Sequence, residues 1–481
     1  MKLRDLIRSI RVLGGSADPE TEIGGVCYDA RAVKPGDLFV AVRGYAVDGH
    51  RFIPKALENG AAAVLCIDEQ PENVPTVLTD NTRLALALVS REFFGDPASG
   101  MRMIGITGTN GKTTSSYLIK HMLEEALGAK VGLIGTNGIM IGEKFIHSER
   151  TTPESYELQK LFRQMADAGC THVVMEVSSH ALVLDRVAGI RFNTALYTNL
   201  TQDHLDFHGT MEAYAEAKRL LFGRCDAAAF NVDDAWADYM IAGAACPVLR
   251  CSAQGREAEL SAENIALRAD GVRYTAAYQG ETAEVNAVLP GLFSVHNTLG
   301  VIGVGLLEGI PFAACAQAMN SASGVKGRME VVPTDGDYSV IIDYSHTPDA
   351  LENALRTLKP VTRGRLIALF GCGGDRDHAK RPSMGRIGGE LADLCIVTSD
   401  NPRTEEPMAI IEDILAGMRE SKTPREVICD RVAAIGWAID NAGPGDVIVL
   451  AGKGHEDYQE VGHEKRHMDE REIVADFLRR R

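Results

Sequence analysis

One stretch decides the fold of this chain: Thr107-Gly108-Thr109-Asn110-Gly111-Lys112-Thr113-Thr114. A short apolar run, 101–106, precedes it, and a helical pattern over 115–127 follows it. A glycine-rich turn between a strand and a helix is the setting in which Gly-Lys-Thr binds nucleotide phosphates. Backbone N–H groups and the helix N-terminus attract the phosphates, Lys112 reaches the β- and γ-phosphates, and the Thr113 hydroxyl suits Mg²⁺. We therefore predict a nucleotide-binding loop.

The loop departs from the common pattern at one position. The usual motif has a glycine five residues before Gly111, where this chain has Ile106. An ordinary strand-to-helix turn is the alternative interpretation, but the order of strand, glycine loop and helix favours phosphate binding. The loop is a variant, and the kind of variant carries information about function.

Length and composition indicate a globular chain of about three domains. The 481 residues are 45% hydrophobic and 24% charged, and the net charge of −16 argues against broad nucleic-acid binding. The ten cysteines stand singly, as is typical of reduced cytoplasmic thiols. No apolar run approaches the ~20 residues that span a bilayer. Residues 1–8 alternate charged and apolar side chains, which predicts an amphipathic first helix and not a signal peptide.

Strand and helix patterns alternate along the chain, which predicts an α/β fold with parallel sheets. Breaker-rich segments at 95–100 and 324–328 divide it into three predicted domains. Short alternating strands over 267–289 indicate a hairpin insert, and ligands are expected at the carboxyl ends of the parallel strands. The predicted domains are 1–98, 99–330 and 331–481.

Polar residues that are candidates for metal or phosphate binding follow the strands of the middle domain. Glu176 ends one strand, and it is either an Mg²⁺ ligand or the cap of the next helix. His204 lies in a polar cluster after another strand, where it could ligate a metal or orient a phosphate, although a lone histidine is more often structural. Lys218 lies on a helical pattern and, taken alone, would be a surface lysine.

The third domain has three polar turns of the same kind. Arg376 in the first, 371–377, suggests an anion clamp more than a dinucleotide site. The second, Asp400-Asn401-Pro402-Arg403, suits a zwitterionic ligand, with the arginine for a carboxylate and the aspartate or asparagine for an ammonium. A plain polar turn is the alternative. The third, 452–456, ends the last strand in the same manner.

Together these motifs resemble the Mur ligases, the ATP-dependent amide-forming enzymes of peptidoglycan synthesis. Members of that family carry the short loop Thr-Gly-Thr-Asn-Gly-Lys-Thr-Thr, which accounts for Ile106. The resemblance covers essentially the whole chain. It implies a small N-terminal α/β domain that binds a UDP-sugar, a central P-loop ATPase-like domain with a parallel sheet, and a C-terminal Rossmann-like domain that binds an amino acid.

The resemblance also implies the reaction and its partners. The turn 400–403 is similar to that of members that add meso-diaminopimelate to UDP-N-acetylmuramoyl-L-alanyl-D-glutamate, and lysine-adding members usually differ there. It implies ligation through an acyl phosphate, with ATP as co-substrate, Mg²⁺ as cofactor, and a domain movement about 324–328. It also implies a cytoplasmic monomer that acts on small molecules, with no nucleic-acid partner and no membrane span.

Site residues are implied one by one by the same resemblance. The implied ATP contacts are Thr109, Asn110, Gly111, Lys112, Thr113, Thr114, Asn297, Arg328, Asp343 and His346. The implied UDP-sugar contacts are Ala30, Thr151, Thr152, Ser178 and Arg186. The implied diaminopimelate contacts are Arg376, Asp400, Asn401, Pro402, Arg403, Gly452 and Glu456. The implied catalytic residues are Lys112, Lys218, His204 and Glu176. The implied metal ligands are Thr113, Glu176, His204 and Lys218, the last in carbamylated form.

Two departures and several alternatives accompany this assignment. Some relatives have serine where this chain has Ala30, and glutamine where it has Leu184, which leaves the exact uridine contacts open. A lysine-adding relative or a folylpolyglutamate synthase is the nearest alternative function. A P-loop phosphotransferase or GTPase is another, but the chain lacks an Asn-Lys-x-Asp guanine-recognition pattern. A non-enzymatic nucleotide-binding module would leave the polar strand ends unexplained.

Overall fold

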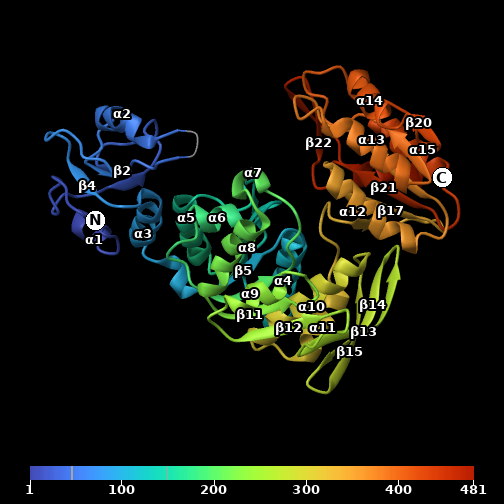
Figure 1. Cartoon of the computed structure of the whole chain (residues 1–481), viewed down its shortest axis with the longest axis horizontal. Helices are drawn as coiled ribbons and strands as arrows, with labels where there is room; N and C mark the ends of the chain where they lie inside the picture. Colours follow the sequence, from blue (N-terminus) through green and yellow to red (C-terminus); the bar gives the residue numbers. More distant parts are fainter. Residues whose placement is uncertain (45–46, 149, 481) are drawn as a thin grey trace. The chain divides into compact units, whose positions relative to one another are not determined.

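A computed structural model describes residues 1–44, 47–148 and 150–480 (Figure 1). Helices and strands alternate throughout, which confirms the predicted α/β class. The chain forms two compact units: Met1–Leu260 with Gly300–Cys315, and Ser261–Leu299 with Ala316–Arg481. The bounds of the three predicted domains stay a prediction.

The first unit begins with a small parallel sheet. Alternate apolar residues of its strands, such as Leu38 and Val40, pack against α3, whose first turn is capped by Asn81. The first helix is a single turn, shorter than the amphipathic helix expected over 1–8. The strands, in sheet order, are β1 (Gly25–Cys27), β2 (Asp37–Val40), β3 (Ala63–Cys66) and β4 (Thr76–Leu78). The helices are α1 (Leu3–Leu6), η1 (Gly49–Phe52), α2 (Ile53–Glu58) and α3 (Thr82–Phe93).

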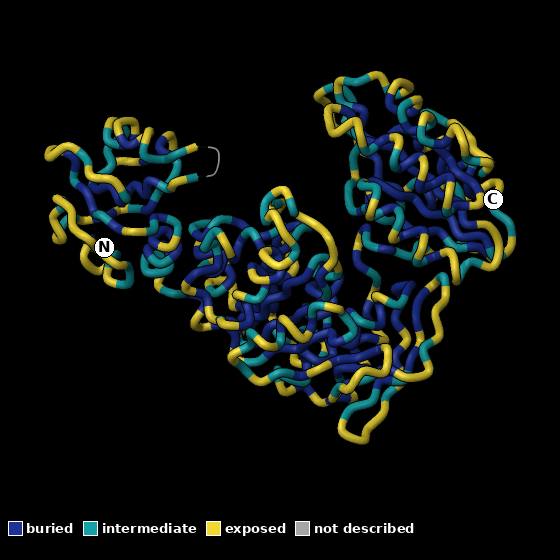
Figure 2. The backbone as a smooth tube through the Cα atoms, in the orientation of Figure 1, coloured by how far each residue is buried: buried dark blue, intermediate teal, exposed yellow. Residues whose placement is uncertain are grey.

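A larger sheet follows in the first unit. Its strands are almost continuously apolar, as expected for parallel strands covered on both faces, and Figure 2 shows them as mostly buried. The order is β12-β11-β10-β5-β9-β6-β7-β8. The segment from β12 to β6 is parallel, and β6-β7-β8 is an antiparallel meander. The strands are β5 (Arg102–Thr107), β6 (Val131–Gly135), β7 (Gly138–Ile141), β8 (Lys144–Ile146), β9 (His172–Glu176), β10 (Phe192–Tyr197), β11 (Cys225–Asn231) and β12 (Val248–Ser252).

Helices cover this sheet, and the core beneath them includes Phe162, Phe192 and Tyr197. Two of the helices, α10 and α11, hold residues of both units. None of the helices in the described part of the chain combines the length and apolar character that crossing a bilayer requires. The helices are η2 (Pro97–Gly100), α4 (Lys112–Leu127), α5 (Ser155–Asp167), α6 (Ser179–Val183), α7 (Leu205–His208), α8 (Met211–Arg219), η3 (Leu220–Gly223), α9 (Ala237–Ala242), α10 (Leu292–Leu307) and α11 (Phe312–Ser321).

The second unit holds an antiparallel meander of β13, β14 and β15, which corresponds roughly to the hairpin insert expected over 267–289. It also holds a six-stranded sheet in the order β16-β17-β21-β18-β19-β20. Within the six-stranded sheet, only the edge strand β16 runs antiparallel to its neighbour. The strands are β13 (Leu260–Arg268), β14 (Gly271–Tyr278), β15 (Glu281–Ala287), β16 (Glu330–Val332), β17 (Ser339–Asp343), β18 (Leu366–Phe370), β19 (Leu394–Val397), β20 (Arg425–Val427), β21 (Val447–Ala451), β22 (Tyr458–Val461) and β23 (Glu464–His467). The helices are α12 (Pro348–Leu358), η4 (Lys359–Val361), α13 (Lys380–Leu391), α14 (Pro407–Ala416), α15 (Arg431–Asp440) and α16 (Glu470–Arg479).

Candidate functional site

The predicted phosphate loop connects β5 to α4, as the sequence indicated. Gly111 has a φ of 85°, a left-handed conformation that favours glycine, and it directly precedes the helix. A Cβ on Gly108 would lie 1.9 Å from Thr198 Oγ1, so only glycine allows this close approach. Thr198 Oγ1 donates to the Asn110 carbonyl at 2.6 Å, and Asn199 Oδ1 accepts from Asn110 N at 2.9 Å. The end of β10 therefore holds the loop in place.

Two lysine ammonium groups converge on this loop. Lys112 Nζ donates to the carbonyl oxygens of Gly108 at 2.7 Å and Thr109 at 2.9 Å. Lys218 Nζ donates to the same Gly108 oxygen at 2.8 Å. Thr113 and Thr114 are buried in the first turn of α4. The structure thus brings Lys218 to the phosphate loop from a helix about one hundred residues further along the chain.

Lys218 is only 1% exposed, so the isolated interpretation of a surface lysine is wrong. Its ammonium lies 4.5 Å from the ring centroid of Tyr214, one turn earlier on α8. Burial lowers the pKa of Lys218 well below its ordinary value, the charge on Lys112 lowers it further, and Asp203 opposes both. A buried lysine with a lowered pKa is a poor structural cation and a good amine nucleophile.

Glu176 lies at the end of β9 and is fully buried. Its two carboxylate oxygens accept from Thr136 N at 2.9 Å and from Thr136 Oγ1 at 3.0 Å. The helix that follows is capped by Ser178, whose hydroxyl accepts from Ala181 N at 3.2 Å. The helix-cap alternative for Glu176 is therefore wrong, and its carboxylate is positioned instead beside the strand ends.

His204 directly precedes α7 in a left-handed conformation, with a φ of 51°. Its ring lies 4.9 Å from that of His180 and 6.0 Å from that of Tyr214, the residue that also contacts Lys218. Its side chain is 47% exposed. Burial lowers the pKa of His180, and the charge of His204 lowers it further. His204 is thus near the phosphate loop through Tyr214, with its ring accessible.

The side chains near the phosphate loop fit the coordination that Mg²⁺ prefers. No group of three His, Cys, Asp or Glu side chains in the described residues is arranged to hold a metal ion by itself. Mg²⁺ does not need such a cage, because it is bound by one or two protein oxygens together with substrate phosphates and water. Thr113 in the phosphate loop and the buried carboxylate of Glu176 fit that pattern.

Four of the predicted UDP-sugar residues lie together in the first unit. Thr152 Oγ1 donates to the Glu176 carbonyl at 2.8 Å and to Ser178 Oγ at 3.3 Å. Arg186 Nη1 donates to the Thr152 carbonyl at 3.0 Å. The neighbouring Thr151 hydroxyl lies 3.0 Å from that of Thr136, which binds Glu176.

Ala30 belongs to a different part of the first unit. It is buried, and Asn59 Nδ2 donates to its carbonyl at 2.8 Å. No hydrogen bond in the described structure joins it to Thr152, Ser178 or Arg186. Two residues before it, Tyr28 donates to both oxygens of Glu157 on α5 at 3.0 Å. The two segments that carry the predicted UDP-sugar residues are linked through this contact.

The turn 400–403 follows β19 in the second unit, and it meets the segment after β21. Asn401 Nδ2 donates to Glu456 Oε2 at 2.9 Å, so two of the predicted diaminopimelate residues are in contact. Arg403 has a φ of 51°, and its guanidinium donates to Glu460 at 2.9 Å and to the Gly374 carbonyl at 2.8 Å. Pro402 and Gly452 are buried at the same strand ends.

Arg376 lies in the loop after β18. It is exposed, and its Nη1 donates to the Asp375 carbonyl at 3.2 Å. Asp375 in turn accepts from Thr404, next to the turn, at 2.7 Å. This loop is therefore attached to the turn that carries Arg403, and a guanidinium remains exposed beside it.

Three side chains around this turn were given no role from the sequence. Lys453 donates to Asn401 Oδ1 at 2.8 Å, Gln459 Nε2 donates to the Asp400 carbonyl at 2.7 Å, and Glu460 pairs with Arg403. Lys453 stands inside the polar turn 452–456, so a signal was present for it. Nothing in the sequence pattern connects 459 and 460 with the turn, because only the hairpin β22-β23 places them there.

The predicted hinge and the start of the third domain form another group. Asp343 Oδ2 accepts from Met329 N at 2.8 Å, and burial raises the pKa of this carboxyl. The guanidinium of Arg328 lies 5.3 Å from the ring centroid of Tyr344, and His346 Nδ1 lies 2.9 Å from the Tyr344 carbonyl. Asn297 is buried on α10 and shares no hydrogen bond with this group in the described structure.

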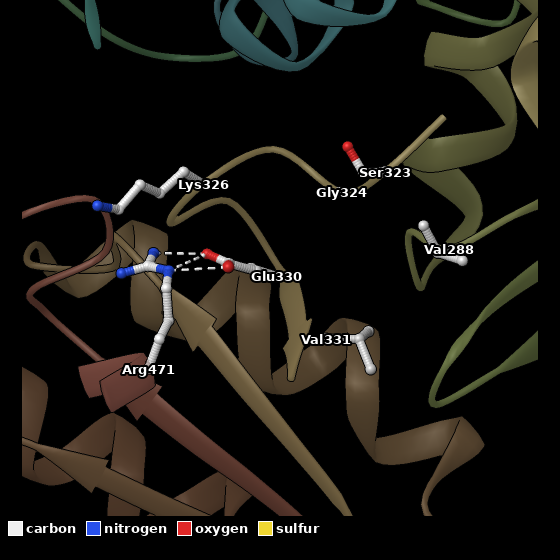
Figure 3. Close-up of a pocket in the computed structure, with 7 residues that line it drawn as sticks. All are labelled: Val288, Ser323, Gly324, Lys326, Glu330, Val331 and Arg471. Carbon is white, nitrogen blue, oxygen red and sulfur yellow. Dashed lines mark hydrogen bonds and ion pairs between the residues drawn. The ribbon is translucent and has the colours of Figure 1, made fainter. Parts of the chain in front are cut away.

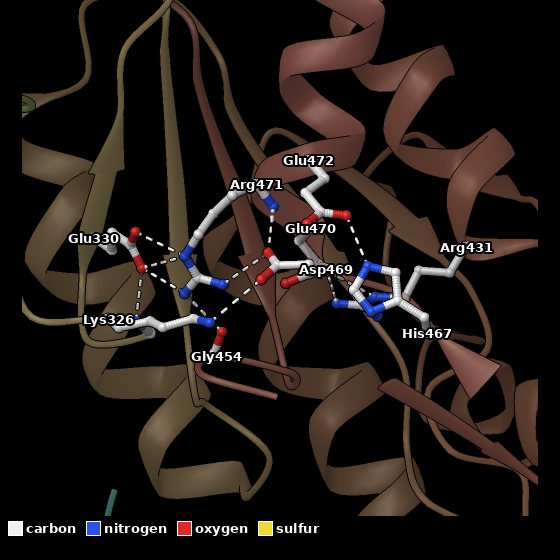
Figure 4. A network of polar contacts seen from close by, with 10 residues as sticks. Lys326, Glu330, Arg431, Gly454, His467, Asp469, Glu470, Arg471 and Glu472 are labelled. Carbon is white, nitrogen blue, oxygen red and sulfur yellow. Dashed lines mark hydrogen bonds and ion pairs between the residues drawn. The ribbon is translucent and has the colours of Figure 1, made fainter. Parts of the chain in front are cut away.

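A cavity of about 470 Å³ lies beside the hinge but contains none of the predicted site residues (Figure 3). Arg471 binds Glu330 at 2.5 to 3.0 Å and Asp469 at 3.0 Å, and Lys326 also pairs with Asp469 at 3.3 Å (Figure 4). These charges balance one another within the network. The lining residues are Val288, Ser323, Gly324, Lys326, Glu330, Val331 and Arg471.

His455 should make the stability of the chain depend on pH. Burial, and after it the charge on Arg328, lowers the pKa of its imidazole to about 4. Because the unfolded value is near 6.5, protons favour the unfolded state, and stability present above pH 6.5 is lost as the pH falls toward 4. The wild type should lose about 2 kcal/mol of unfolding free energy between pH 7.5 and 5 that a His455→Asn variant does not lose.

Urea unfolding at the two pH values measures this difference. His467 is the matched control, because Glu472 raises its pKa through a hydrogen bond and the sign is therefore opposite. His467→Asn should be as sensitive to acid as the wild type or more so. Equal acid sensitivity of the wild type and His455→Asn would contradict the prediction.

Sequence comparison finds three matching family profiles. The Mur ligase family, catalytic domain, matches residues 22–93; the Mur ligase middle domain matches 106–305; and the Mur ligase, glutamate ligase domain, matches 327–454. The three profiles match successive, non-overlapping segments of the chain.

Individual relatives match over almost the whole length. The chain is 45% identical over 465 residues to the UDP-N-acetylmuramoyl-L-alanyl-D-glutamate--2,6-diaminopimelate ligase of Clostridium botulinum, with 95% of each chain covered. It is 44% identical to the protein of the same name from Clostridium tetani, with 99% of each covered. A solved structure of a ligase of that name aligns with a TM-score of 0.76 and 33% identity, over 100% of this chain and 99% of the other. This chain belongs to the Mur ligase family.

Proposed function

We propose that this chain is the ATP-dependent, ADP-forming ligase that adds meso-diaminopimelate to UDP-N-acetylmuramoyl-L-alanyl-D-glutamate in peptidoglycan synthesis. Family membership and the names of relatives that match from end to end support this reaction. The observation that carries the choice of amino acid is Arg403, held by Glu460 and the Gly374 carbonyl at the end of β19. Diaminopimelate has a second carboxylate for that guanidinium, and lysine has none.

The first step takes place at the phosphate loop. A carboxylate of the D-glutamate residue attacks the γ-phosphate of ATP, and ADP leaves, so that an acyl phosphate forms. Lys112 has its ammonium over the loop and would move from the carbonyls of Gly108 and Thr109 to the transferring phosphoryl group, whose charge it neutralises. Thr152, Ser178 and Arg186 would hold the sugar-linked dipeptide next to Glu176.

Mg²⁺ would be held by Thr113, Glu176, His204 and a carbamylated Lys218, and it would supply charge neutralisation to the phosphates. The lowered pKa of Lys218 supports the modification, because a neutral amine reacts with carbon dioxide whereas an ammonium does not. Carbamylation would convert a buried cation into an anionic oxygen donor beside the phosphate loop.

The second step forms the amide. The neutral amine of diaminopimelate attacks the acyl phosphate, a tetrahedral intermediate forms, and phosphate leaves. Arg376, Asn401, Arg403 and Glu456 would orient the amino acid from the carboxyl ends of β18, β19 and β21. A movement about 324–328 would bring the amino acid to the acyl phosphate and exclude water.

We assign the binding of the UDP-sugar, of ATP and of the amino acid to the domains 1–98, 99–330 and 331–481, respectively. We expect the protein to act as a cytoplasmic monomer.

Amino-acid specificity is the test of this function. With ATP and the UDP-dipeptide present, ADP release should be fast with meso-diaminopimelate and at least 10-fold slower with lysine or glutamate. Arg403→Ala should lower kcat/KM for diaminopimelate by about 10- to 100-fold, the effect of losing a charged hydrogen bond, and leave the rate with lysine unchanged.

The matched control for this experiment is Arg386→Gln, on the exposed side of α13 and paired with Glu390 at 3.1 Å. It should behave as the wild type. Equal wild-type rates with lysine would contradict diaminopimelate specificity, preference for glutamate would favour a folylpolyglutamate synthase, and ATP hydrolysis without an amide product would favour a phosphotransferase.

A further inference from the structure

Lys453 is a fully buried cation at the turn that carries the predicted diaminopimelate residues. It follows β21, and its side chain is 0% exposed. Its ammonium donates to Asn401 Oδ1 at 2.8 Å and to Glu456 Oε2 at 2.7 Å, and it lies 5.1 Å from the ring centroid of Tyr458. Lysine is almost never buried unless it is paired. Both of its hydrogen-bond partners belong to the predicted amino-acid site.

These bonds leave one particular carboxylate oxygen for a ligand. Asn401 Oδ1 also accepts from Glu460 N at 2.8 Å, which fixes which end of the amide is oxygen. Glu456 Oε2 accepts from both Lys453 and Asn401, whereas Oε1 accepts no hydrogen bond within the described structure. The Glu456 side chain is 16% exposed. A carboxylate oxygen with no bond in a half-buried site is an acceptor for an incoming ammonium.

Asp400, the other carboxylate of the turn, is enclosed. Its Oδ1 accepts from Asn401 N at 2.7 Å, and its Oδ2 is buried with no hydrogen bond to a described residue. A Cβ on Gly452 would lie 2.6 Å from Oδ2, so the backbone passes close to it. The buried pair Arg431 and Glu470, at 2.8 Å, lies in the same region. Glu456, and not Asp400, is therefore the carboxylate that an ammonium can reach.

We propose that Lys453 is a positioning residue for recognition of the non-reacting amino group of diaminopimelate: it fixes Asn401 and Glu456 so that Glu456 Oε1 binds that ammonium. This inference rests on the proposed function. The reacting amine must be neutral to attack the acyl phosphate, so a carboxylate that holds an ammonium serves the other amino group. Lys453 itself contacts no substrate and acts through its two partners.

Comparison of two amino acids tests this role. In 2-aminopimelate the amino group at one end of diaminopimelate is missing, and both carboxylates remain. The wild type should prefer diaminopimelate, and Lys453→Met should reduce the ratio of kcat/KM values by about 10- to 100-fold. The change should appear in the KM for diaminopimelate, while the KM values for ATP and the UDP-dipeptide stay the same.

A double-mutant cycle separates positioning from general stability. Glu456→Gln removes the acceptor charge, and if Lys453 acts through it, Lys453→Met in that background should change the amino-acid preference by less than 3-fold. Lys465→Met is the matched control, because Lys465 is exposed and lies 4.1 Å from the same Tyr458 ring. It should keep the wild-type preference. Lys453→Gln, which keeps a donor, replaces Lys453→Met if the latter does not fold, as judged by circular dichroism.

Four results would overturn the inference. Additive effects of the two substitutions would show that Lys453 does not act through Glu456. An unchanged preference in Lys453→Met, or equal increases in all three KM values, would reduce Lys453 to a structural role. Absence of any ligation product with the wild type would overturn the proposed function as well, so the two failures are distinguishable.

Discussion

A Lys112→Met variant should release ADP about 10²- to 10³-fold more slowly than the wild type, at saturating concentrations of all three substrates. The ammonium of Lys112 already lies over the phosphate loop, bound to the carbonyls of Gly108 and Thr109. Loss of one such charged donor to a transition state typically costs this much in kcat. The measurement is steady-state ADP release, with nucleotide binding followed separately by calorimetry.

The control is a lysine of the same helix with a different role. Lys120 pairs with Glu124 at 2.5 Å, two turns further along α4. Lys120→Met should retain kcat within about 2-fold, because Lys120 lies about two helical turns from the loop. Its side chain is 7% exposed and that of Glu124 is 30% exposed, so urea unfolding of the variant is measured as well, to separate a loss of stability from a loss of activity. A Lys112→Met variant with kcat within 3-fold of the wild type would remove Lys112 from phosphoryl transfer.

Lys218→Ala should lose about 10³-fold in activity and recover part of it when acetate or formate is added. Alanine leaves a cavity beside the Gly108 carbonyl and Tyr214, where a small carboxylate can take the place of the carbamate oxygen atoms. The wild type should lose activity when bicarbonate and carbon dioxide are removed, and Lys218→Ala should not respond to them. ADP release in degassed and supplemented buffers measures both effects.

Lys218→Met is the matched control, because methionine fills the space that alanine leaves. It should be as inactive as Lys218→Ala and should not be rescued by carboxylates. Rescue of both variants would place the carboxylate elsewhere. Undiminished activity in Lys218→Ala would show that Lys218 is no part of the site.

Local patterns were sufficient for the α/β class and for the phosphate loop with the strand and helix beside it. The strand Arg102–Thr107 and the helix Lys112–Leu127, on either side of the loop, were predicted because apolar periodicity and glycine turns are local signals. The short edge strands β8, β16 and β20 were not predicted. Three or four residues at the edge of a sheet carry too little periodicity to be recognised, and pairing with a neighbour determines them.

The sequence by itself determined the α/β class, the phosphate loop, the three polar turns and, through their resemblance, the Mur ligase family. Only the tertiary structure decided the state of individual side chains. It buried Lys218 against the Gly108 carbonyl, gave the cap of α6 to Ser178 in place of Glu176, and joined Lys453 to Asn401. The physical reason is that motifs depend on neighbours in the chain, whereas burial, pKa and hydrogen-bond partners depend on residues that only folding brings together.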